Sequence, residues 1–79
     1  MTNISVECYA GSRYPERPRA LWWEGERLEV EGIERHWRTQ GVAHRDPILY
    51  HYQVRTAQGG FHLIYDTDDE TWSATRSER

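Results

Sequence analysis

The sequence contains no lysine, a single cysteine and no long apolar run. With Cys8 alone, the chain cannot form an internal disulfide or a cysteine zinc cluster. No stretch approaches the roughly 20 apolar residues that cross a bilayer. The N-terminal segment MTNISVECYA lacks the basic start and apolar centre of a signal peptide. We therefore predict a soluble, cytoplasmic protein that binds no membrane.

The charge balance is acidic, although every basic residue is an arginine. Ten basic and thirteen acidic residues give a net charge of −3 at pH 7. Contacts with phosphate need a basic excess, so this sign disfavours non-specific DNA binding. A local patch is the alternative, because Arg13, Arg17 and Arg19 lie in one segment with only Glu16 to offset them. Arginine without lysine reflects either genome composition or the suitability of guanidinium groups for stacking at interfaces.

The length of 79 residues predicts one small domain, residues 1–75, followed by a polar tail, residues 76–79. Four tryptophans, five tyrosines and one phenylalanine supply much of the area that can be buried. Each ring can bury roughly 150–250 Å². A small core built from large rings is therefore feasible.

Alternation of apolar and polar residues predicts strands along most of the chain. It begins at residues 4–10 and continues in two hairpins, at residues 20–31 and 50–65, before a short closing strand near Trp72. Residues 31–38 have a helical alternative, since Ile33 and Trp37 are spaced by four. Five or six antiparallel strands without a convincing helix predict an all-β fold, either an SH3-like barrel or a strongly bent sheet.

The first hairpin, LWWEGERLEV, contains two adjacent tryptophans that must point to opposite faces. A turn at residues 24–25 or 25–26 places Leu21 and Trp23 on one face with Leu28 and Val30. That face is the predicted core. Trp22 points away from it.

Two further expectations concern register. A turn at residues 58–59 in the second hairpin pairs Val54 with Leu63 and Tyr52 with Tyr65. After Val30 the parity of apolar residues changes, because the next inward candidates are Ile33 and Trp37. We expect Gly32 to form a β-bulge that produces this change.

The sequence leaves three alternatives for what packs over the Trp22 indole. They are the N-terminal strand or neighbouring loop, the Arg27 guanidinium through a cation–π contact, and a partner protein. Tryptophan and arginine are enriched at binding hot spots, which favours a partner-binding patch. Its predicted members are Trp22 with Ala20, Arg27, His51, Arg55, His62 and Ile64. A nucleic-acid variant of this site combines Trp22 with Arg13, Arg17, Arg19 and Arg55.

Catalytic and metal chemistry find little support in the sequence. His36, His44, His51 and His62 show none of the close spacings typical of zinc ligands. The acidic segment 66–70 lacks the glycine and the final glutamate of an EF-hand loop. No arrangement for nucleophilic catalysis stands out. We predict no cofactor, no metal and no enzymatic activity, with an enzyme built on the histidines as the remote alternative.

The segments LWWEGERLEVEGIERHW and YQVRTAQGGFHLIYD, followed by a late tryptophan, resemble a family of short bacterial β-domains of unknown function. Such domains occur as stand-alone proteins and near the C-terminus of Y-family polymerase-like mutagenesis proteins. The resemblance implies an adaptor domain with a link to DNA repair. Together with the residues, it predicts a non-catalytic interaction module whose partner is a protein or a second copy of the chain. A nucleic-acid-binding β-barrel is the rival.

Overall fold

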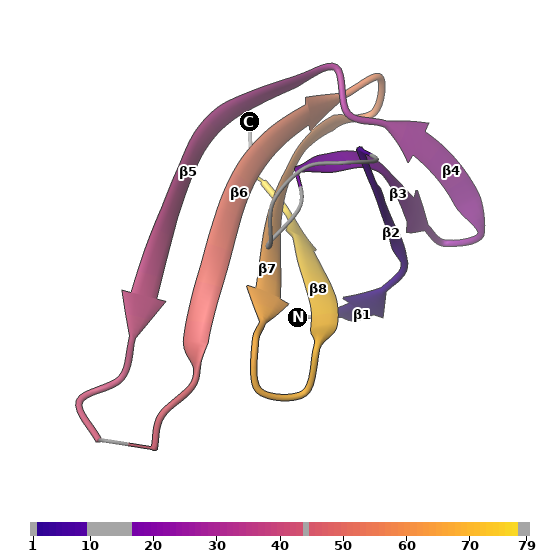
Figure 1. Ribbon diagram of the computed structural model, residues 1–79. Coiled ribbons are helices and arrows are strands. Elements are labelled where there is room, and N and C mark those ends of the chain that lie inside the picture. Colours follow the sequence, from indigo (N-terminus) through magenta and orange to yellow (C-terminus); the bar gives the residue numbers. More distant parts are fainter. Residues whose placement is uncertain (1, 10–16, 44, 78–79) are drawn as a thin grey trace.

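In the computed structural model, which describes residues 2–9, 17–43 and 45–77, these ranges contain strands and turns and no helix. The strands form two antiparallel sheets, with orders β1-β8-β7-β6-β5 and β2-β3-β4 (Figure 1). The all-β prediction is confirmed. The eight strands are β1 (Thr2–Ile4), β2 (Val6–Cys8), β3 (Pro18–Trp23), β4 (Glu26–Glu29), β5 (Gly32–Gln40), β6 (Ile48–Thr56), β7 (Gly59–Asp66) and β8 (Thr71–Arg76).

Two corners explain why eight strands appear where five or six were expected. Ser5 alone separates β1, which pairs with β8, from β2, which pairs with β3. At the second corner, the Val30 amide donates to the Arg19 carbonyl at 2.8 Å and the Glu31 amide donates to the Arg55 carbonyl at 2.7 Å. The chain thus passes from one sheet to the other between these two residues. The helical alternative for residues 31–38 is wrong, because β5 covers most of this segment.

No helix among the described residues is long and apolar enough to cross a membrane.

The core lies between the inner faces of the two sheets. Leu21 and Leu28 contribute from the three-stranded sheet, where they are direct partners across the β3–β4 hairpin. Their turn is Glu24–Gly25, and both residues have the positive φ angles that a tight two-residue hairpin requires. Trp23 packs edge-on against Phe61, with ring centroids 5.1 Å apart. The predicted core face of the first hairpin is therefore confirmed. From the five-stranded sheet come Tyr52, Val54, Phe61, Leu63 and Ala74.

The second hairpin has a different register from the predicted one. Its turn is residues 57–58, and Val54 pairs with Phe61 rather than with Leu63. The Thr56 hydroxyl donates to the Gly59 carbonyl at 2.9 Å and accepts from the Gln58 amide at 3.1 Å, which closes the shorter loop. A shift by two residues keeps every side chain on its predicted face.

The bulge after the second corner also differs from the prediction. The register shifts between Ile33 and Arg35, rather than at Gly32. Ile33 lies opposite Val54 on the inner face, whereas Trp37 lies opposite His51 on the outer face. The expectation that Ile33 and Trp37 both face the core is therefore wrong for Trp37.

At the C-terminal end, β8 runs through Arg76, and the Ser77 amide donates to the Gly60 carbonyl at 2.9 Å.

Candidate functional site

Trp22 and Arg27 lie together on the outer face of the three-stranded sheet. They are direct cross-strand partners, and the guanidinium carbon lies 5.9 Å from the indole centroid. Arg27 donates to Glu7 at 3.0 Å and pairs with Glu29 at 3.5 Å. The hydrogen bond to Glu7 raises the pKa of Arg27. Arg27 covers Trp22 only in part, since the indole remains 37% exposed, and the neighbouring Ala20 is fully buried.

Arg55, His62 and Ile64 belong to the outer face of the five-stranded sheet. Arg55 forms an ion pair with Glu34 at 3.1 Å, and Ile64 lies directly opposite His51. Because the inner faces of the two sheets pack on one core, their outer faces point in opposite directions. The structure therefore divides the residues of the predicted patch between two separate surfaces.

The three arginines predicted to form a basic patch do not share one surface where they are described. Arg19 lies 3.7 Å from Glu7, with its guanidinium 5.6 Å from the Tyr9 ring. Arg17 instead lines a pocket on the opposite side of β3. Arg13 lies outside the described residues.

His51 and His62, the histidine pair, are joined by a hydrogen bond on the outer face. His51 Nδ1 lies 3.0 Å from His62 Nε2, and His51 Nε2 lies 2.8 Å from Thr39 Oγ1. The Trp37 indole stacks on His51, with centroids 4.9 Å apart and planes within 6°. Burial lowers the pKa of both histidines, and the facing His62 ring lowers that of His51 further. Both rings are therefore neutral at pH 7.

The histidine pair offers two imidazoles, fewer than the three or four ligands of a protein zinc site. Within the described ranges, no group of three or more His, Cys, Asp or Glu side chains is placed to hold a metal ion. Both ring nitrogens of His51 already take part in hydrogen bonds. The histidine pair therefore packs beside the Trp37 ring as a hydrogen-bonded structural contact.

The histidine pair predicts a pH-dependent stability. The folded pKa values lie below the ordinary value of 6.5, so the unfolded chain binds more protons in acid. The stabilisation is present above pH 6.5 and is lost as the pH falls through the lowered folded pKa values. We expect the free energy of unfolding, measured with urea, to decrease from about pH 7.5 to about pH 5.5.

The variant His62→Gln should flatten this pH dependence. His36→Gln is the matched control, because His36 is exposed on the inner face and leaves the pair intact. An unchanged slope in His62→Gln would contradict the assignment.

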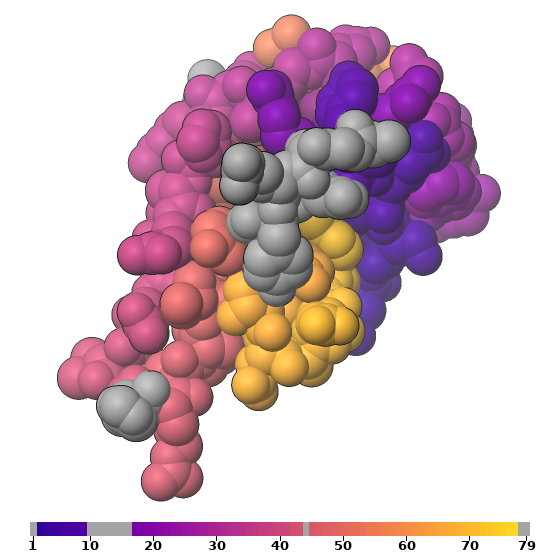
Figure 2. All heavy atoms as spheres, viewed as in Figure 1, coloured from indigo at the N-terminus to yellow at the C-terminus, as the bar shows by residue number. Residues whose placement is uncertain are grey.

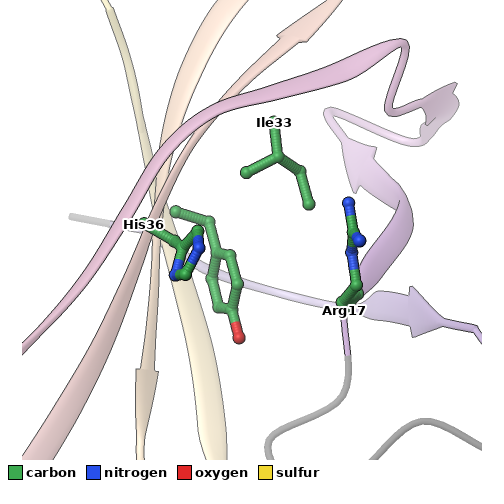
Figure 3. A pocket seen from close by; sticks show the side chains of 4 residues that line it. Arg17, Ile33 and His36 are labelled. Carbon is green, nitrogen blue, oxygen red and sulfur yellow. The ribbon is translucent and has the colours of Figure 1, made fainter.

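A pocket of about 420 Å³ lies on the inner side of β5 (Figure 3). Its described lining residues are Arg17, Ile33, His36 and Tyr52. Arg17 precedes β3 and faces Ile33 and His36 across the hollow. The His36 ring stacks on Tyr52, with centroids 6.3 Å apart. Burial raises the pKa of Tyr52 above the ordinary value of 10, so its hydroxyl is a neutral group of the pocket wall. The pocket therefore combines an apolar wall with one permanent cation.

An aromatic row, Tyr50, Tyr65 and Trp72, crosses the inner face next to the pocket. Tyr50 pairs with Tyr65, and Tyr65 pairs with Trp72 across β6, β7 and β8. The Tyr65 and Trp72 ring centroids lie 5.0 Å apart, and all three side chains are half-buried. Arg38, the partner of Tyr50, stands at the β5 end of the row. The aromatic row and Arg38 therefore extend the inner surface beyond the pocket.

β5 is an edge strand of nine residues. Among the described strands, only β6 pairs with it. Glu34, Arg35 and His36 are exposed, as are residues 38–40. The β5–β6 hairpin extends past the rest of the sheet, as Figures 1 and 2 show. Such an edge presents unpaired amides and carbonyls to another strand.

Sequence reasoning did not select Ile33, His36, Arg38 or Tyr52 as site residues. Their common face follows from the bulge between Ile33 and Arg35, which the sequence does not locate. The usable signal was the alternation of His36 and Arg38 with Trp37, which places two polar groups on the face opposite the indole.

A scan against protein-family models and searches of curated proteins and solved structures found no significant match.

Proposed function

We propose that this protein is a non-catalytic interaction module that binds an extended segment of a partner protein along β5. The observation that carries the proposal is a nine-residue edge strand with a pocket of about 420 Å³ on its inner side. When a peptide adds to a sheet edge, main-chain hydrogen bonds supply affinity. Pockets beside the edge then select alternate side chains. β5 and the pocket meet both requirements.

The proposal includes an SH3-like barrel as the framework of the module. The chain changes sheet at Ser5 and between Val30 and Glu31. At these corners β1 leads into β2 and β4 leads into β5, so the edges of the two sheets are joined through the chain, which supports a barrel-like framework. Such a framework holds β5 rigidly while leaving its outer edge available.

An adaptor role linked to DNA repair follows only from the resemblance to the short bacterial β-domains, whereas a cytoplasmic location is proposed from the single cysteine. The genes beside this one test the link to DNA repair. A neighbouring polymerase or repair operon would support the link, and a phage or toxin neighbourhood would contradict it.

Selection from a displayed library of random short peptides tests the binding mode. We expect enriched peptides whose affinity, measured by fluorescence polarisation, falls at least about tenfold when alternate backbone amides are N-methylated, because methylation removes ladder hydrogen bonds. Failure to enrich any peptide, or equal affinity of the methylated peptides, would contradict strand addition.

Trp22→Ala distinguishes β5 from the surface predicted around Trp22. The affinity of a selected peptide should be unchanged, since Trp22 lies in the three-stranded sheet and points away from the core. A strong loss in a folded variant would instead assign binding to the Trp22 surface.

A second candidate function is single-stranded nucleic-acid binding, which the aromatic row with Arg38 favours. Bases stack on aromatic rings while arginines contact the phosphates. This candidate ranks second because the exposed acids of the β7–β8 turn, Asp68, Asp69 and Glu70, adjoin the row. Titration with a fluorescent oligothymidine at about 50 and 200 mM salt tests it, since phosphate contacts weaken steeply with salt.

A further inference from the structure

Three described arginines around β5 lack an ion pair, as do Arg45 in the β5–β6 loop and Arg76 in β8. Arg19 and Arg27 share Glu7, and Arg55 pairs with Glu34. In the described part of the chain, no carboxylate lies within ion-pair distance of Arg17, Arg35 or Arg38. The whole chain has a net charge of −3, so this uncompensated positive charge is a local feature.

Two of these three arginines lie on the inner side of the edge strand, beside His36. His36 and Arg38 lie opposite Tyr52 and Tyr50 on the inner face, and Arg17 faces this side across the pocket. A strand added to β5 would therefore send every second side chain towards these three groups.

The outer side of the same edge is aromatic. Trp37 is half-buried there, and the Arg35 guanidinium lies 4.6 Å from the centroid of its ring. The indole stacks on His51 with ring centroids 4.9 Å apart, and it makes a tilted ring contact with His62 at 5.4 Å. The alternate side chains of an added strand would pass beside this indole and the Arg35 guanidinium over it.

We infer that the segment bound along β5 is acidic, with carboxylates at alternate positions on the inner side and apolar residues between them on the outer side. This inference rests on the proposed function and specifies its partner. The inner carboxylates complement Arg17 and Arg38, and the apolar side chains contact Trp37. A second copy of β5 fits less well, because it carries the same basic residues.

Fluorescein-labelled synthetic peptides test the charge requirement. One peptide alternates glutamate with valine, and its matched control replaces each glutamate with glutamine. We expect the glutamate peptide to bind at least about tenfold more tightly at about 50 mM salt and to lose this advantage at about 500 mM.

Two arginine variants locate the effect. Arg17→Gln and Arg38→Gln should each weaken the glutamate peptide about threefold to tenfold and leave the glutamine peptide unchanged. Arg55→Gln is the matched control, since Arg55 lies on the outer face and pairs with Glu34. Circular dichroism establishes that each variant is folded.

Each result separates this inference from the proposed function. Equal binding of the two peptides would overturn the acidic preference and leave strand addition intact. Equal weakening of both peptides by Arg17→Gln would also overturn it. If neither synthetic peptide binds, the inference fails, and the library selection then decides whether strand addition fails as well. Light scattering measures whether the chain forms a dimer and whether Trp37→Glu abolishes that dimer. A dimer that is lost in this variant would assign the β5 edge to a second copy of the chain.

Discussion

Replacing Phe61 with alanine is expected to remove a large part of the free energy of unfolding. The Phe61 side chain is fully buried, and it contacts the edge of the Trp23 ring from the other sheet. Truncation of a buried phenylalanine costs about 3–5 kcal/mol. A domain of this size has a total stability of only about 4–12 kcal/mol. Urea titration followed by circular dichroism measures the loss.

Thr75→Ala is the control for Phe61→Ala. Thr75 is exposed on β8, where it pairs with His62 on the outer face. Its substitution should change the free energy of unfolding by no more than about 0.5 kcal/mol. A loss below about 1 kcal/mol in Phe61→Ala would contradict the placement of this ring between the two sheets.

The two adjacent tryptophans should differ strongly when each is replaced with alanine. Trp23→Ala is expected to lower the free energy of unfolding by about 2–4 kcal/mol, because this indole packs against the core from the three-stranded sheet. Trp22→Ala should cost less than about 1 kcal/mol, since it removes a partly exposed ring and one cation–π contact. Urea titration of both variants gives the comparison.

Similar losses in the two tryptophan variants would contradict the assigned faces of β3. A larger loss in Trp22→Ala would place the wrong indole in the core. Tryptophan fluorescence provides a second measurement. Compared with the emission of the parent protein, Trp23→Ala should remove the contribution of a more buried indole than Trp22→Ala does.

The opposite orientations of Trp22 and Trp23 were predictable because they depend only on strand alternation and a short turn. Leu21, Trp23, Leu28 and Val30 share one face for either turn that the sequence allows, so the core side of this hairpin does not require exact register. The all-β architecture was predictable for the same reason.

Register and bulges were less predictable because they depend on single local contacts. The Thr56 hydroxyl closes the β6–β7 turn one residue earlier than Gln58-Gly59 suggested. The extra residue between Ile33 and Arg35 reverses the face of Trp37. Nothing in the apolar pattern distinguishes this bulge from one at Gly32.

The candidate site was the least predictable feature, because it depends on how two sheets pack. Arg17 meets β5 only after the chain turns the corner between Val30 and Glu31. The pairing of arginines with carboxylates is also a tertiary property, since Glu7 and Arg27 are 20 residues apart in sequence. The sequence supplied the residue types, and the fold divided them between two outer faces and one pocket.

Hydrogen exchange tests the central claim, strand addition to β5, most directly. Amide exchange is measured by NMR on the labelled protein, with and without the tightest selected peptide. We predict new protection at alternate amides between Arg35 and Gln40, those that point away from β6, and little change in β3 and β4. Protection centred on the Trp22 hairpin, or peptide binding without protection in β5, would contradict the account.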